Sequence, residues 1–206
     1  MDGTLLSSIA AAERVWGGWA RRHGLDVEAF LPTIHGVRAE DTIRRQNLDG
    51  IDIDEEVRWV ERAEIDDVDG VVAIDGILDF LNALPDDKWA IVTSATRELA
   101  TRRLSAAGIA PPKIFVTAED VKRGKPAPDP FLTAAERLGV RASDCLVFED
   151  APAGIAAGEA AGADVMVITA THGGHFETAH ATTGNYVDIV VFARDDGTLA
   201  VERRRA

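Results

Sequence analysis

The sequence predicts an α/β protein in which a mostly parallel sheet carries helices on both faces. From about Thr93 onward, short apolar runs alternate with longer amphipathic stretches. Apolar strands in such alternation are typical of a parallel sheet that is covered on both sides. Three of the amphipathic stretches are followed by a glycine where a helix should stop, at Gly108, Gly139 and Gly162.

This part of the chain is expected to hold four strands and three helices. The strands are predicted at residues 89–92, 113–116, 145–148 and 164–168. The helices are predicted at residues 98–107, 129–138 and 152–161. Two later strands, at 186–192 and 199–202, are expected to join through a turn at 195–197.

Residues from roughly 8 to 72 have a different pattern. Helical spacing occurs at 10–23, 39–48 and 54–65, without a convincing strand between these stretches. We therefore predict a small helical insertion at 8–72 and a core formed by 1–7 and 73–206.

Composition limits the possible partners of the 206-residue chain. Acidic residues outnumber basic ones 35 to 22, and a net charge of −13 argues against nucleic acid and anionic membranes. A phosphorylated substrate would need local positive charge or a metal, because the global field repels it. The single cysteine, Cys145, excludes an internal disulfide. With no apolar run of membrane-spanning length and no signal peptide, the expected location is the cytoplasm.

Four residues with chemical potential follow predicted strands or lie in loops at one edge of the sheet: Ser94, Lys125, Glu149 and Asp150. In parallel sheets, ligands bind at the carboxyl ends of the strands. Pattern alone therefore places these residues where a ligand site is expected.

Ser94 and Lys125 are candidate phosphate-binding residues. The Ser94 hydroxyl and nearby backbone N–H groups can bind phosphate; alternatively, Ser94 or Thr96 caps the following helix, and both roles are compatible. Lys125 lies in Gly-Lys-Pro-Ala-Pro, where prolines stiffen the loop that aims its ammonium group. We favour phosphate neutralisation over a solvated surface lysine.

Glu149 and Asp150 are candidate Mg²⁺ ligands. Mg²⁺ prefers a few carboxylates together with water and substrate phosphate. Helix capping by Asp150 is the alternative, but it leaves Glu149 unexplained. The histidines at 172, 175 and 180 lie in a polar, glycine-containing stretch that we expect to be a solvated loop and not a metal site.

Four motifs occur in order along the chain. They are MDGTLL at 1–6, VTSATR at 92–97, GKPAPDP at 124–130 and FEDAPAGIAAG at 148–158. Together they resemble the haloacid dehalogenase-type phosphatases, in the branch of the sugar, glycerol and 2-deoxyglucose-6-phosphate phosphatases, which is similar to β-phosphoglucomutase. The resemblance implies a Rossmann-like core with a mobile helical cap inserted after the first motif, and Mg²⁺ as cofactor.

The resemblance also implies roles for individual residues. Asp2 would be the general acid/base and would offer its backbone carbonyl to Mg²⁺, with Asp150 and Glu149 completing the metal site. Ser94, Ala95 and Lys125 would hold the transferring phosphoryl group. His35 and Arg38 look like cap residues that reach into the site.

The first motif of this family runs D-x-D-G-T, and its first Asp is the nucleophile. Met1 falls at the x and Asp2 at the second Asp, so the nucleophile and its strand would precede Met1. We expect an upstream apolar strand that ends in Asp, and negligible hydrolysis by the chain as given.

The expected activity of the full-length form is Mg²⁺-dependent hydrolysis of small phosphorylated sugars or polyols through an aspartyl-phosphate intermediate. One alternative is a phosphosugar mutase of the β-phosphoglucomutase type. The other is a non-catalytic phosphosugar-binding protein. The expected partner is a small phosphorylated molecule, and the sequence leaves the oligomeric state open.

Overall fold

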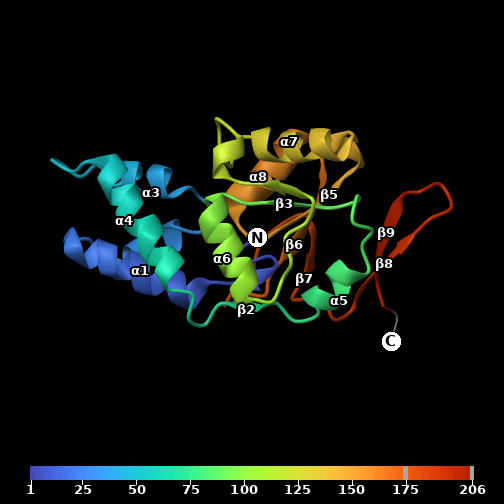
Figure 1. The fold of residues 1–206 in the computed structure, drawn as a ribbon, viewed down its shortest axis with the longest axis horizontal. Helices are drawn as coiled ribbons and strands as arrows, with labels where there is room; N and C mark the ends of the chain where they lie inside the picture. The colour runs from blue at the N-terminus through green and yellow to red at the C-terminus, as the bar shows by residue number, and fades with distance from the viewer. Residues whose placement is uncertain (174–175, 205–206) are drawn as a thin grey trace.

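The computed structural model describes residues 1–173 and 176–204, and it has the expected α/β architecture with a group of helices at one end (Figure 1). No helix within the described residues is both long and apolar enough to cross a membrane.

The end helices come from the segment at 8–72, called the helical segment below. They are α1 (Ile9–Arg22), α2 (Val27–Phe30), the 3₁₀ turn η1 (Leu31–Thr33), α3 (Ala39–Arg45) and α4 (Ile53–Asp66). Trp16 and Trp19, three residues apart on α1, share one face of that helix and pack with Phe30, Ile43 and Val60 in a separate hydrophobic cluster. The carboxylates of Asp26 and Asp52 cap α2 and α4 by accepting backbone N–H hydrogen bonds.

The two ends of the helical segment lie side by side. The short strands β1 (Leu6–Ser7) and β2 (Val72–Ala73) pair antiparallel, with Leu6 opposite Ala73. Leu6 is fully buried, so this pairing attaches the helical segment to the main core. The division at residues 8–72 stays a prediction.

The main sheet is parallel but forms two separate groups of strands. β3 (Ala90–Val92) pairs with β4 (Ile114–Val116), while β6 (Asp164–Ile168) lies between β5 (Leu146–Glu149) and β7 (Ala181–Thr183). The four strands predicted in this region are confirmed to within one residue at each end. β7 was not predicted.

Helices cover both faces of these strands (Figure 1). α6 (Arg97–Ala106) and α5 (Ile77–Asn82) bury side chains in the same cluster as Ile91 and Phe115. α7 (Asp129–Leu138) and α8 (Pro152–Ala161) pack in another cluster with Val147, Val165 and Val167. The three helices predicted between the strands are confirmed; α5 was not predicted.

A large cavity of about 710 Å³ separates the two groups of strands. Residues of both β3 and β5 line it, including Ile91 and Phe148, together with Trp89 just before β3. Among the described residues, β3 pairs only with β4 and β5 only with β6. Each of these two strands therefore has an unpaired edge.

The predicted late hairpin is confirmed. β8 (Ile189–Ala193) and β9 (Leu199–Arg203) pair antiparallel, and the Gly197 N–H donates to the Arg194 carbonyl at 2.9 Å. β8 begins three residues later than predicted because Tyr186 turns inward. The Tyr186 ring lies 5.0 Å from the Phe80 ring and its hydroxyl donates to the Thr4 carbonyl at 3.1 Å.

Tyr186 links the C-terminal region to the first motif, which predicts two different losses of stability. Tyr186→Phe removes one buried hydrogen bond and should lower the free energy of unfolding by about 1 kcal/mol. Tyr186→Ala also leaves a cavity and should cost about 3–5 kcal/mol. Urea unfolding measures both, and Val187→Ala, at an exposed neighbour, is the control. Equal losses for the Phe and Ala variants would contradict this packing.

Candidate functional site

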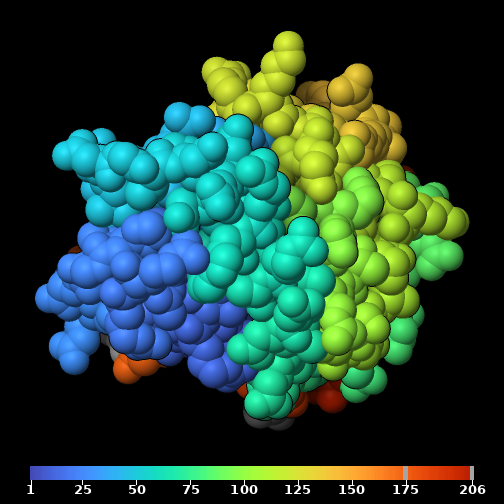
Figure 2. All heavy atoms as spheres, turned by 60° about the vertical axis from the view of Figure 1, so that its left-hand side comes forward, coloured from blue at the N-terminus to red at the C-terminus, as the bar shows by residue number. Residues whose placement is uncertain are grey.

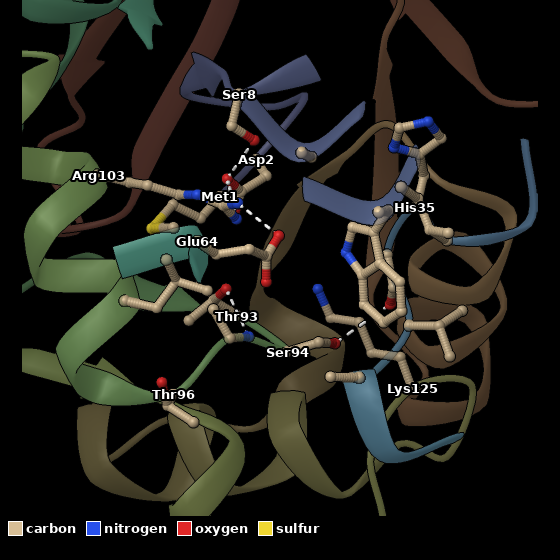
Figure 3. A pocket seen from close by; sticks show the side chains of 18 of the residues that line it. Met1, Asp2, Ser8, His35, Glu64, Thr93, Ser94, Thr96, Arg103 and Lys125 are labelled. Carbon is tan, nitrogen blue, oxygen red and sulfur yellow. Dashed lines mark hydrogen bonds and ion pairs between the residues drawn. The ribbon is translucent and has the colours of Figure 1, made fainter. Parts of the chain in front are cut away.

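A small cavity of about 110 Å³ lies between the helical segment and the carboxyl ends of β3 and β5 (Figure 3). In Figure 2 the blue-to-cyan helical segment packs directly against the green surface that contains α6. The predicted residues Asp2, His35, Ser94, Ala95, Lys125, Glu149 and Asp150 all line this cavity. Of the predicted site residues, Arg38 is the one outside its lining.

Lys125 and Glu149 form a buried ion pair at the floor of the cavity. The two residues are 5% and 3% exposed, and the Lys125 ammonium donates to Glu149 Oε1. Burial alone would raise the pKa of Glu149, but the charge and hydrogen bond of Lys125 hold that pKa below its usual value. A Cβ at Gly154 would lie 2.1 Å from Glu149 Cδ, so the glycine in α8 gives this carboxylate its space.

Asp150 is held against the first motif. The Thr4 hydroxyl donates to Asp150 Oδ1 at 2.8 Å. Gly3 has φ +70°, and a Cβ there would lie 1.8 Å from Asp150 Oδ2, so only glycine fits. Burial and the neighbouring charge of Glu149 raise the pKa of Asp150 to about 7.

Asp2 accepts two hydrogen bonds on the same oxygen. The Ser8 hydroxyl donates to Asp2 Oδ1 at 2.6 Å and Arg103 Nη1 donates to it at 3.0 Å. Although burial opposes ionisation, these partners and the α-ammonium of Met1 hold the pKa of Asp2 below its usual value. Oδ2 accepts no hydrogen bond from the described residues.

The oxygen donors at this site fit a Mg²⁺ ion that is bound by only a few protein ligands. Among the described residues, no three His, Cys, Asp or Glu side chains converge on one point. Lys125 pairs with Glu149 and Arg103 pairs with Asp2, whereas Asp150 has no cationic partner among the described residues. Burial and the neighbouring charge of Glu149 raise the pKa of Asp150, and a divalent cation would offset both effects. Mg²⁺ commonly takes one or two carboxylates together with water and phosphate.

The helix-capping alternatives are not observed. Neither Ser94 nor Thr96 caps α6; instead, the Glu119 carboxylate accepts from the Arg97 N–H at 2.9 Å. Likewise, α8 begins after Ala151 without a side-chain cap from Asp150. The Ser94 hydroxyl donates to the Gly36 carbonyl of the helical segment at 3.1 Å.

His35 and Arg38 point to different places. His35 lines the cavity, and burial lowers the pKa of its ring. Arg38 Nη2 donates to the carbonyls of Ala118 and Val121 at 3.0 and 2.9 Å. The structure thus shows Arg38 joining the helical segment to the loop after β4, and its contact with substrate stays a prediction.

The expectation of a solvated loop is wrong for His172. Its Nε2 lies 2.9 Å from the Asp150 carbonyl, and its ring packs on Phe176. His180 Nε2 lies 2.8 Å from Glu159 Oε1. His175 lies outside the described residues.

The sequence reasoning missed Arg103, Glu64, Ser8 and Thr4. Arg103 falls on the buried face of α6 with Leu99, Ala100 and Leu104. An arginine on the apolar face of a helix is unusual unless it is paired with an acidic residue. This pattern could have identified Arg103 as a buried, paired residue.

The chain matches the family model of the haloacid dehalogenase-like hydrolases over residues 1–162. It is 40% identical to hexitol phosphatase A of Escherichia coli (strain K12) over 203 residues, covering 97% of this chain and 91% of that protein. It is 36% identical to glycerol-1-phosphate phosphohydrolase 2 of Saccharomyces cerevisiae, covering 83% and 73% of the two chains.

Solved structures share the fold. A hydrolase from Pseudomonas syringae superposes with a TM-score of 0.71 at 27% identity, covering 82% of this chain and 81% of that one. β-Phosphoglucomutase from Clostridium difficile superposes with a TM-score of 0.76 at 20% identity, covering 89% and 87%. The predicted Rossmann-like fold is thereby confirmed.

The raised pKa of Asp150 predicts a pH-dependent stability when divalent metal is absent. Its protonated form stabilises the fold fully below about pH 4, and this contribution is lost as pH rises through about 7. Between these values, the free energy of unfolding of the native chain should fall relative to that of Asp150→Asn. Urea titrations from pH 4 to 8 measure the difference, with exposed Asp87→Asn as the control. Parallel curves for the native chain and Asp150→Asn would contradict the assignment.

Proposed function

Because the chain belongs to the haloacid dehalogenase-like hydrolase family, we propose that it hydrolyses phosphate monoesters of small sugars or polyols with Mg²⁺. The observation that carries this proposal is the buried Lys125–Glu149 pair beside Asp2 and Asp150 in one cavity. A polyol substrate is also consistent with the hexitol and glycerol phosphatases among its relatives.

Each residue has a physical task in this reaction. The Lys125 ammonium, aimed by Glu149, neutralises phosphoryl oxygens as negative charge is redistributed among them. The Ser94 hydroxyl turns from the Gly36 carbonyl to the phosphoryl group. Asp2 must be protonated to give its proton to the leaving oxygen, and it later accepts a proton from the attacking water. A residue bonded to the Met1 nitrogen would remove the ammonium charge that helps to lower the pKa of Asp2. Mg²⁺, held by Asp150 and the Asp2 backbone carbonyl, supplies further positive charge when bound.

The attacking carboxylate is proposed to belong to a residue bonded to Met1. The Met1 α-nitrogen is buried, and burial and the nearby charge of Lys125 lower its pKa, with Glu149 and Asp150 also close enough to act on it. A residue joined to that nitrogen would lie among these three side chains. Of the carboxylates on the chain itself, Asp2 pairs with Arg103, Glu149 pairs with Lys125, and Asp150 is assigned to Mg²⁺.

The strand that would carry this residue has a place in the sheet. The 710 Å³ cavity lies between the unpaired edges of β3 and β5 and is lined by apolar side chains such as Trp89 and Phe148. An extended segment there would pair with both edges. Each buried backbone group left unpaired costs about 1–3 kcal/mol, so filling the cavity would also stabilise the fold.

The charges in the small cavity favour hydrolysis over the mutase reaction. A mutase must bind a bisphosphate and therefore needs cations for a second phosphate. Of the described residues lining the cavity, Arg103 pairs with Asp2 and Glu64, Lys125 pairs with Glu149, and burial lowers the pKa of His35. The carboxylates of Glu61 and Glu64 instead suit the hydroxyl groups of a neutral leaving group.

The test compares phosphate release by the 206-residue chain with release by a form extended by a five-residue apolar strand ending in Asp before Met1. An extension ending in Asn is the matched control. With Mg²⁺ and a hexitol phosphate or glycerol 1-phosphate, the Asp form should exceed both others in kcat by about a thousandfold or more. Equal turnover by the Asn form would refute the nucleophile. No turnover by the Asp form would favour the phosphosugar-binding alternative.

Lys125→Met in the active form should lower kcat/KM by about a hundredfold or more, because charge stabilisation in the transition state is lost. Lys122→Met, at an exposed lysine in the same loop, is the control. Since Lys125→Met leaves Glu149 buried without its partner, the Lys125→Met/Glu149→Gln double variant checks for a folding defect. Unchanged kcat/KM in both Lys125 variants would refute the assigned role.

A further inference from the structure

Arg103 is a buried cation that joins the core to the helical segment. It lies on α6, is 5% exposed, and donates through Nη1 to Asp2 Oδ1 and through Nη2 to Glu64 Oε1, at 3.0 and 2.8 Å. Glu64 belongs to α4 of the helical segment and is 6% exposed. Figure 3 shows the three side chains meeting at one wall of the cavity.

The guanidinium is held by its two carboxylates and not by a full set of acceptors. Arg103 Nε is buried and has no hydrogen-bond partner among the described residues. A buried charge with an unsatisfied donor is costly, so the fold would gain little from this residue as packing alone. Its two contacts reach one residue of the reaction centre and one residue of the helical segment.

The contacts at Asp2 define which oxygen is left for chemistry. Ser8 and Arg103 both donate to Oδ1, so they fix the plane of the carboxylate and leave Oδ2 without a partner among the described residues. Ser8 precedes α1, the first helix of the helical segment. The hydrogen bonds from Ser8 and Arg103 to Asp2 thus both depend on the position of the helical segment.

We propose that Arg103 is a positioning residue that aligns Asp2 only when Glu64 of the helical segment is in place. The inference rests on the proposed function for the role of Asp2, but the coupling itself is a property of the fold. When α4 moves away from α6, Arg103 loses one of its two anchors and the Asp2 carboxylate loses its fixed orientation. Proton transfer is thereby confined to the arrangement in which the helical segment covers the cavity.

The coupling is tested first without turnover, by hydrogen exchange on the 206-residue chain. Glu64→Leu should raise amide exchange several-fold in α4 and also in residues 1–8, because Arg103 binds both Glu64 and Asp2. Arg103→Met should raise exchange in residues 1–8 to a similar degree, and Glu64→Leu should add nothing in that background. Arg102→Met, at the exposed neighbour, is the matched control. Unchanged exchange in residues 1–8 for both variants overturns the coupling.

The second measurement uses the form that turns over. Arg103→Met should lower kcat by about a hundredfold with KM changed by less than about threefold, because a misplaced Asp2 affects the chemical step and not substrate binding. Arg103→Ala should regain part of the lost kcat on addition of guanidinium, whereas Arg103→Lys offers no planar fork for two carboxylates and should stay impaired. An unchanged kcat, or a loss that guanidinium does not restore, refutes the positioning role. Absence of turnover in the native extended form refutes the proposed function alone, because the exchange experiment still tests Arg103.

Discussion

Two opposite charges that are both almost completely buried determine the arrangement of this site. Lys125 neutralises the buried Glu149 carboxylate, and its charge and hydrogen bond hold the pKa of Glu149 below its usual value. The local sequence meets this requirement: Gly154 leaves room for the Glu149 carboxylate, and the loop around Pro126 and Pro128 restricts the backbone on either side of Lys125 and Ala127. The ammonium is consequently held at the carboxyl ends of β3 and β5, where a phosphoryl group can reach it.

The same pairing of charges extends to the opposite wall. Arg103 is placed between Asp2 and Glu64, so the side chains of Arg103 and Lys125 in the cavity wall each face a carboxylate. The chain has a net charge of −13, and these cations are already paired with carboxylates. An anion can therefore bind here only if it replaces a carboxylate as the partner of one of the cations. Asp150 has no cationic partner among the described residues, and burial together with the charge of Glu149 raises its pKa, which makes its carboxylate suitable for a divalent cation.

Much of the fold was predictable because strand and helix patterns follow local chemistry. α7 and α8 were predicted to the residue, since a proline opens each of them and a glycine follows each. β1 and β2 were not predicted because strands of two residues carry too little periodicity, and β7 was not predicted because its sequence, Ala-Thr-Thr, lacks the apolar run of β3 and β4. The motifs correctly predicted that Asp2, Ser94 and Lys125 lie in one cavity. No local pattern shows that Arg38 donates to the carbonyls of Ala118 and Val121. The Arg103 bridge depends on packing between α4 and α6, which lie far apart in the sequence.

The central claim is that Lys125 and its neighbours form a site for a phosphoryl group. Isothermal titration of the 206-residue chain with inorganic phosphate, in the presence of Mg²⁺, tests this claim without requiring turnover. We expect one binding site in the native chain and in Lys122→Met, and at least about tenfold weaker binding in Lys125→Met, since a charge-assisted hydrogen bond is lost. Equal phosphate affinity in the native chain and Lys125→Met would contradict the claim.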